Sequence, residues 1–146
     1  LDAICTKCYD EYTLNKEDIP VKHVIATTAA PGAVGPYSQA IEANGFVFVS
    51  GQLPLDPATG AFVSDNTAEQ AEQSIKNLLA VLEAAGCKAE DVVKTTVFLI
   101  DIGDFAVVNE VYAKYFKGEC PARCAMQVSA LPKGALVEIE AIAVKP

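Results

Sequence analysis

The chain has 146 residues, of which 51% are hydrophobic, and this is enough for one domain with its own core but too little for two. Its 11 basic and 19 acidic residues leave a formal net charge of -8, so the surface offers no broad positive field for a phosphate backbone, and nucleic acid is not expected as the main ligand. The apolar runs fall well short of the roughly 20 residues that cross a bilayer, so no membrane partner is expected.

Residues 1–20 are rich in charge and hold neither a strand period nor a helix period for long. We expect an extension outside the main domain, interpreted as a tag, a presequence remnant or a partner-binding tail. The domain itself is expected over residues 21–146. Its first segment, VKHVIAT, is a strand candidate, and the glycines and prolines of TAAPGAVGPYSQA then predict a shaped loop over residues 28–40.

A β-hairpin is predicted next, because the apolar segments Ile41–Ala43 and Phe46–Ser50 flank Asn44 and Gly45. Both central residues of a type I′ turn need positive φ, and the pair Asn-Gly supplies it readily. Residues 54–60 break regular structure again, and a turn is expected there at Asp56 and Pro57.

An amphipathic helix follows, and it starts at a sequence that resembles a capping box, Thr67 to Gln70. Gly86 is expected to end it. Between these points apolar residues recur at helical spacing, at positions 71, 75, 78, 79 and 82. Residues 92–100 are rich in β-branched side chains and nearly continuous in hydrophobicity, which predicts a central strand covered on both faces.

A second helix is predicted over Asp104–Phe116, after which Lys117 and Gly118 end it. Asn109 is expected close to its inward face. That face is expected to carry Phe105, Val108, Tyr112 and Phe116. Two further strands are predicted over residues 122–128 and 136–144, joined by residues 131–134.

The element order indicates an α+β domain in which two helices pack on one face of a mixed sheet. Alternate residues of the last strand, from Val137 to Ala143, form an apolar face for the helices. The other face of this strand carries Glu138 and Glu140 among aliphatic side chains. Two carboxylates in such a setting predict a subunit interface or a cleft.

Arg123 lies in an apolar strand segment, where a guanidinium needs a partner. Its planar fork pairs with a carboxylate through two parallel hydrogen bonds, so either Glu138 or Glu140 satisfies it within the fold or an acidic ligand does. Glu138 can position or deprotonate a water if burial raises its pKa, although strand glutamates are more often solvated or ion-paired.

Other polar groups are candidates for the same site. The loop at residues 35–39 can present the Tyr37 hydroxyl and Ser38 to a pocket, or Tyr37 can simply pack on the sheet. Asn109 on an apolar helix face must find hydrogen bonds, either with backbone groups or with a ligand.

The chain contains five cysteines, at positions 5, 8, 87, 120 and 124. Because the apolar content supports a core without cross-links, we interpret them as reduced thiols in a reducing compartment, the cytoplasm or an organelle. Cys5 and Cys8 have CxxC spacing, but His23 is the only histidine and no second CxxC completes a zinc site, so no metal is expected. Cys120 and Cys124 lack a histidine base in their motif and are expected in the core. No GxGxxG or GxxxxGK(S/T) motif indicates a nucleotide cofactor.

Five segments occur in unbroken order between residues 22 and 144: GPYSQAI, VFVSGQLPLDPATG, VVKTTVFLIDIGDFAVVNEVYAKYF, PAR and LPKGALVEIEAIAV. Together they resemble the RidA family of reactive imine and enamine deaminases, also called YjgF or L-PSP endoribonuclease-like. The closing pair, PAR and LPKGALVEIEAIA, is the most diagnostic part. The resemblance implies a chorismate-mutase-like α+β fold and a homotrimer whose sheets form a central barrel, with three sites in the clefts between subunits.

The resemblance also implies roles for single residues. Arg123 of the PAR motif is expected to bind the substrate carboxylate, and Glu138 of the VEIEA strand is expected to orient the attacking water. Tyr37, Gly51 and Asn109 are expected to shape the pocket. The implied reaction is hydrolysis of 2-iminobutanoate, 2-iminopropanoate and enamines such as 2-aminoacrylate to 2-keto acids and ammonia, without a cofactor.

Ala125 departs from the family pattern, in which many relatives carry a cysteine two residues after the arginine. The backbone of Ala125 can still contact substrate or water, and Cys124 is expected on the opposite face of the strand. Some members of the family are described as ribonucleases or translation inhibitors, holdase chaperones or ligand-binding regulators, and these functions stay as alternatives. The acidic charge balance argues against RNA, whereas Arg123 and Glu138 favour a small-molecule site.

Overall fold

The computed structural model describes residues 21–146, which form one mixed sheet with the strand order β1-β2-β3-β6-β4-β5. Neighbouring strands are antiparallel except β4 and β5, which run parallel. The strands are β1 (His23–Ile25), β2 (Ala40–Ala43), β3 (Phe46–Gln52), β4 (Val92–Leu99), β5 (Ala122–Gln127) and β6 (Val137–Val144). The helices are α1 (Thr67–Ala84) and α2 (Phe105–Tyr115). The α+β prediction is confirmed, whereas the predictions for residues 1–20, including Cys5 and Cys8, lie outside the described residues.

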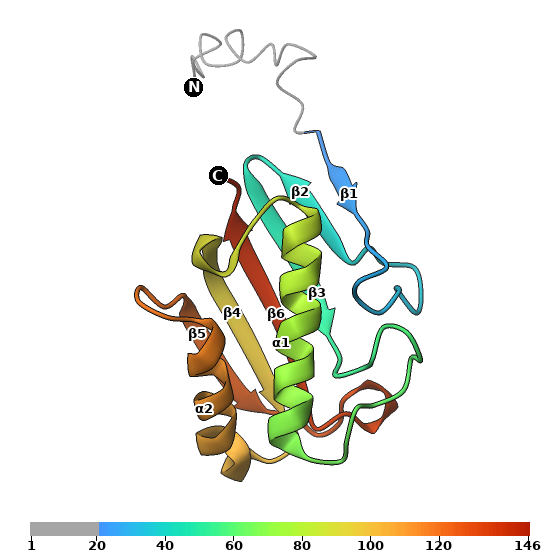
Figure 1. Ribbon diagram of the computed structural model, residues 1–146, viewed down its shortest axis with the longest axis vertical. Helices are drawn as coiled ribbons and strands as arrows, with labels where there is room; N and C mark the ends of the chain where they lie inside the picture. The colour runs from blue at the N-terminus through green and yellow to red at the C-terminus, as the bar shows by residue number, and fades with distance from the viewer. Residues whose placement is uncertain (1–20) are drawn as a thin grey trace, which may run out of the picture.

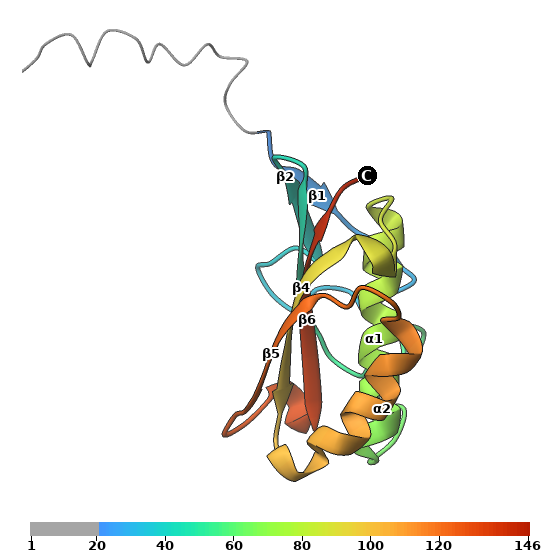
Figure 2. The same ribbon diagram turned by 90° about the vertical axis from the view of Figure 1, so that its left-hand side faces the viewer.

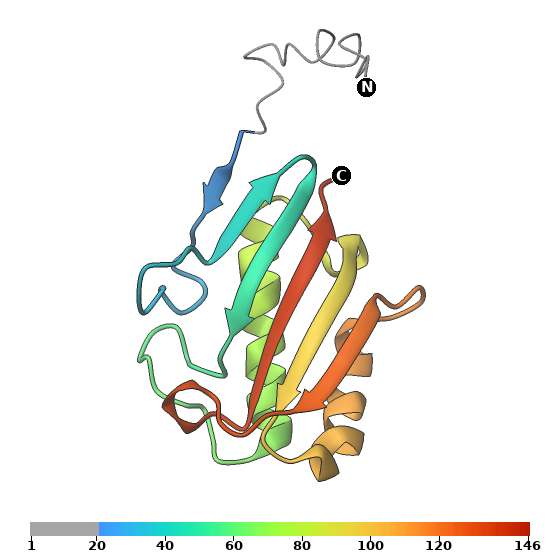
Figure 3. The same cartoon turned by 180° about the vertical axis from the view of Figure 1, so that it is seen from behind.

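Both helices cover the same face of the sheet (Figures 1 and 2), and Figure 3 shows the opposite face toward the viewer with the helices behind it. The core lies between the helices and the sheet, where Ile75 and Leu78 of α1 and Val137 and Ile139 of β6 have no exposed surface. The apolar face predicted for the last strand is therefore confirmed. Across residues 21–146, neither helix has the length and apolar character needed to cross a membrane.

β4 is central in the sheet, as predicted, but only one of its faces is buried. Val97 and Leu99 face the helices and are buried, whereas Thr96 and Phe98 on the other face stay partly exposed. The predicted coverage of both faces is wrong for the single chain, because the two helices lie on one side of the sheet.

The turns that the sequence predicts are present. Asn44 and Gly45 have φ values of 51° and 75° and connect the antiparallel strands β2 and β3, which confirms the hairpin. The Asp56 carboxylate accepts the backbone N–H groups of Ala58 at 2.8 Å and Thr59 at 2.9 Å, which confirms the turn there. The second turn begins the connection from β3 to α1.

α1 begins one residue after Asn66, which is its N-cap, so the predicted capping box of Thr67 and Gln70 is wrong. The Asn66 side chain accepts two free backbone N–H groups of the first turn, at 2.9 and 3.2 Å. Thr67 instead donates its hydroxyl to Asp104 at 2.6 Å. Because asparagine caps a helix at least as well as threonine, Thr67 is left to connect the start of α1 to the start of α2. Gly86, with φ of 78°, ends the helix as predicted.

α2 presents Val108 and Tyr112 to the core, and Phe116, just after its last turn, is also buried, as predicted. Phe105 is an exception to the predicted inward face, because 36% of it is exposed and its ring lies over the Arg123 guanidinium. It therefore packs on a charged side chain rather than in the apolar core.

Candidate active site

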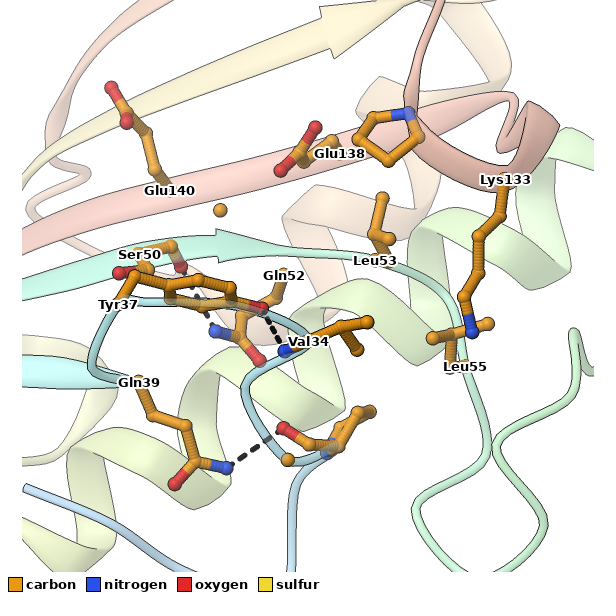
Figure 4. A pocket seen from close by; sticks show the side chains of 14 residues that line it. Val34, Tyr37, Gln39, Ser50, Gln52, Leu53, Leu55, Lys133, Glu138 and Glu140 are labelled. Atoms are coloured by element: carbon orange, nitrogen blue, oxygen red, sulfur yellow. Dashed lines mark hydrogen bonds between the residues drawn. The ribbon is translucent and has the colours of Figure 1, made fainter.

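A cavity of about 510 Å³ lies where the loop at residues 31–39, the end of β3 and β6 meet. Figure 4 shows Glu138 and Glu140 projecting from β6 and Tyr37 from the loop. An apolar cavity with a few polar groups is the usual form of a small-molecule site. Its lining includes Val34, Tyr37, Gly51, Lys133, Glu138 and Glu140.

Glu138 reaches this cavity because Gly51 leaves room for its carboxyl group. Gly51 lies where the pairing of β3 with β6 shifts register, between Val49 and Gln52. A Cβ atom at position 51 would lie 2.8 Å from Cδ of Glu138, so any side chain there would displace the carboxyl group. Burial raises the pKa of Glu138, and the neighbouring Glu140 raises it further. A carboxylate with a raised pKa accepts protons more readily, which suits a general base.

The loop that carries Tyr37 is held by the buried side chain of Gln39. This amide accepts one backbone N–H at 2.7 Å and donates to the carbonyl oxygen of Pro31 at 2.8 Å. The Tyr37 side chain is half exposed, and its hydroxyl accepts the N–H of Val34 at 3.2 Å. Ser38 lines a second hollow, next to β1, and not the cavity with Glu138. Of the two loop residues predicted for the site, Tyr37 lines both spaces, whereas Ser38 lines only the second hollow.

Two polar side chains on the inner face of α1 hold the loops around the cavity. Asn77 donates to the carbonyl oxygens of Leu53 and Leu55, both at 2.9 Å. Gln70 donates to a carbonyl oxygen ahead of the helix at 2.8 Å and accepts the N–H of Leu136 at 2.8 Å. Neither residue was predicted from the sequence, although two amides seven positions apart on the apolar stripe of the helix were a usable signal.

Arg123 lies on the opposite face of the sheet from Glu138. In β5 it stands beside Thr95 of β4, which is buried under the helices. The carbon at the centre of its guanidinium lies 4.6 Å from the ring centroid of Tyr112 and 5.4 Å from that of Phe105. Both rings belong to α2, so this helix and the edge strand β5 position the arginine together.

The alternative of an internal ion pair between Arg123 and Glu138 or Glu140 is wrong within residues 21–146. The ion pairs there join Lys76 to Glu72 and Lys145 to Glu42. The physical reason is the register of the sheet, since residues beside one another in β5, β4 and β6 share a face, and Arg123 is aligned with buried positions. Its N–H donors are therefore available to a ligand.

Asn109 is partly buried on the stripe of α2 that contains the two aromatic residues beside Arg123. Ala125, two residues along β5, shares the face of Arg123. Cys124 lies on the face of the sheet opposite the helices, which we call the bare face, as strand alternation predicts. Cys120 and Cys124 were expected in the core, but both are exposed free thiols. Cys124 is exposed because β5 is an edge strand whose bare face is uncovered in one chain, and Cys120 lies in the connection between α2 and β5.

The structure thus gathers the predicted residues into two groups. The glutamate group consists of Tyr37, Gly51 and Glu138, and the arginine group consists of Asn109, Arg123 and Ala125. The cavity that contains the first group contains none of the second. Neither group alone combines a cationic anchor with a base, so one chain does not bring the expected site together.

The family follows from comparisons with known proteins. A family model described as Endoribonuclease L-PSP matches residues 27–145. The human 2-iminobutanoate/2-iminopropanoate deaminase is 53% identical over 125 residues, which cover 86% of this chain and 91% of that protein. The chain belongs to the RidA family. The resemblance that the sequence motifs carried is confirmed.

Solved structures of RidA-family proteins share the fold described above. A protein of unknown function of the conserved Rid family from Yersinia pestis is 52% identical with a TM-score of 0.83, and the match covers 85% of this chain and 99% of that chain. TdcF of E. coli, solved with bound serine, is 43% identical with a TM-score of 0.81 and the same coverage of both chains. The description of the family model names an endoribonuclease, whereas the human relative is named an imine deaminase, so the chemistry of the two residue groups has to distinguish these activities.

Proposed function

We propose that this RidA-family chain is an imine deaminase that hydrolyses short 2-imino acids to 2-keto acids and ammonia. The observation that carries the proposal is Arg123, the only arginine of the sequence, whose guanidinium lies on aromatic rings and pairs with no carboxylate of residues 21–146. A planar fork in this state suits a small anionic ligand. The name of the human relative supports 2-iminobutanoate and 2-iminopropanoate as substrates. The enamine 2-aminoacrylate is also a substrate in this proposal, because protonation of its methylene carbon gives an imine.

The arginine group and the glutamate group meet, in this proposal, between copies of the chain. The bare face of the sheet carries the exposed apolar side chains Phe46, Phe48 and Met126, which a neighbouring copy would cover. A homotrimer with its sheets around a central barrel would place the arginine group of one chain opposite the glutamate group of the next. The three clefts of such a trimer are equivalent by symmetry.

Hydrolysis then needs protein groups and one water. Arg123 binds the substrate carboxylate and fixes the adjacent imine carbon, which is electrophilic once its nitrogen is protonated. Glu138 takes a proton from the water as the oxygen attacks this carbon, and returns it to the amine nitrogen. The C–N bond breaks, and the departing ammonia takes the hydroxyl proton as the carbonyl forms. Tyr37 and Asn109 orient the substrate, and the backbone of Ala125 contacts it.

RNA hydrolysis is the second candidate, because the family description names an endoribonuclease. A protein that binds RNA through its phosphates needs a positive surface. This chain has a net charge of -8, one arginine and one histidine. Charge therefore favours a small anionic substrate over a phosphate backbone.

Release of keto acid is the direct test. An amino-acid oxidase generates the imino acid in the cuvette, and semicarbazide traps the imine that has not been hydrolysed. We expect the protein to accelerate keto-acid release and to lower the trapped fraction. Absence of acceleration with several short-chain amino acids would contradict the proposed reaction.

Subunit mixing tests the position of the site. We expect Arg123→Ala and Glu138→Gln to be inactive alone, but refolding them together in equal amounts should restore activity in about a quarter of the clefts, those with an intact residue from each chain. Keto-acid release per chain measures the recovery. A mixture as inactive as its parents would place both residues in one chain's site, and mixing wild type with Glu138→Gln controls for the refolding yield.

A further inference from the structure

We propose that Phe105 and Tyr112 are positioning residues that hold the Arg123 guanidinium in one orientation and leave its N–H groups free for the substrate carboxylate. We call this pair of rings the aromatic clamp. The inference rests on the proposed function of Arg123 as the carboxylate anchor, and it adds Phe105 and Tyr112 to the residues proposed for the site.

The geometry places both rings against the guanidinium. Its central carbon lies over the Tyr112 ring at 4.6 Å and over the Phe105 ring at 5.4 Å. Phe116 stacks on Tyr112, with 4.3 Å between the ring centroids and 29° between the planes. The cation therefore continues a stack of aromatic groups that begins in the core.

The Tyr112 ring is fixed by its own hydroxyl. This group shares a buried hydrogen bond of 2.8 Å with the hydroxyl of Thr95. Thr95 stands directly beside Arg123 in the pairing of β4 with β5. The bond therefore holds the ring next to the strand position from which the arginine projects.

The position of Phe105 in the chain is fixed by hydrogen bonds of the residues that precede it. Asp104 accepts the hydroxyl of Thr67 at 2.6 Å, which connects this point to the start of α1. The N–H of Ile102 donates to the side chain of Gln127 at 3.1 Å, which connects it to the end of β5. The turn that precedes Phe105 is therefore hydrogen-bonded both to the start of α1 and to the end of β5.

A ring beneath a guanidinium attracts the cation through its quadrupole and uses none of the five N–H donors. An ion pair in the same place would use them. A carboxylate therefore meets a fork that is already oriented and still unpaired, so less conformational entropy is lost when it binds. Loss of a ring should weaken substrate binding more than it slows the chemical step.

Steady-state kinetics test the clamp at Phe105, the more exposed of its two rings. Phe105→Leu keeps apolar bulk without a π face, and we expect KM for the imino acid to rise about three- to tenfold with kcat little changed. Phe105→Tyr restores the ring and should stay within about twofold of wild type. Ile102→Ala removes an exposed apolar side chain from the same turn and serves as the matched control.

Because Arg123 is the only arginine, its Nε–Hε group gives a single side-chain signal in a nitrogen–proton NMR spectrum. Protons above an aromatic ring are shielded, so we expect Phe105→Leu to move this signal downfield and Phe105→Tyr to leave it near its wild-type position. Titration with 2-oxobutanoate should move the signal at lower concentration in wild type than in Phe105→Leu.

The two readouts separate the clamp from the proposed function. Unchanged KM and an unmoved arginine signal in Phe105→Leu, with Arg123→Ala inactive, would overturn the clamp and leave the deaminase intact. If the wild-type protein released no keto acid, the proposed function would fail, and the NMR signal would then decide the clamp alone. A Phe105→Tyr variant that behaved like Phe105→Leu in both readouts would also overturn it.

Discussion

Arg123→Ala is expected to lower kcat/KM for 2-iminobutanoate by about a hundredfold or more. A hydrogen bond to a charged group contributes about 1.5–3 kcal/mol, and the guanidinium fork makes two such bonds to one carboxylate. The anchor also orients the imine carbon toward the water, so kcat should fall together with binding. Keto-acid release at several substrate concentrations measures both effects.

Two variants make this result specific. Arg123→Lys keeps the charge but loses the bidentate geometry, and we expect it to be severely impaired as well. Lys114→Ala removes an exposed cation from the last turn of α2 and should keep wild-type activity. Near-normal turnover of Arg123→Ala, in a protein of unchanged thermal stability, would refute the carboxylate anchor.

The single arginine also permits a chemical version of the experiment. A vicinal dicarbonyl reagent that attacks guanidinium groups finds a single one in this sequence, that of Arg123. We expect one adduct per chain, with activity lost in proportion to the modified fraction. Excess 2-oxobutanoate should protect the residue, because its carboxylate would occupy the same N–H donors.

Local signals in the sequence predicted most of the fold. Asn44 and Gly45 specified their turn through backbone conformation, and Gly86 specified the end of α1. The start of α1 was predicted wrongly because Asn66 and Thr67 are adjacent and both can cap a helix. Which residue caps depends on the tertiary partner of Thr67, the carboxylate of Asp104, 37 residues away.

The site was harder to predict than the fold, because its arrangement depends on register. The motif resemblance selected Arg123 and Glu138, but single-strand patterns do not say that β5, β4 and β6 align these residues on opposite faces. That alignment excluded the internal ion pair. The sequence placed Phe105 on an apolar helix face, and its contact with the arginine became visible only once α2 was seen against the edge of the sheet.

Glu138→Gln is expected to lower kcat by about a hundredfold to ten-thousandfold, the usual range for loss of a general base. The amide has nearly the shape of the carboxyl group, so the space beside Gly51 should still accommodate it. KM should change little, because the Arg123 anchor remains. Keto-acid release under substrate saturation measures the loss, and a kcat within about threefold of wild type would remove Glu138 from the chemistry.

The pH dependence of kcat tests whether Glu138 acts as a base. Glu138 must be ionised to accept a proton, and burial and Glu140 raise its pKa above the ordinary 4.5, so wild-type kcat should fall as pH falls through that raised value. Glu140→Gln removes the charge that repels the Glu138 carboxylate and makes Glu138 easier to ionise. The fall of kcat on the acid side of the profile, its acid limb, should therefore move to lower pH, while activity at higher pH persists. Glu138→Gln should lack the limb. If Glu140→Gln left the limb in place, the group that titrates would not be Glu138, because these two carboxyl groups share one face of β6 and one cavity.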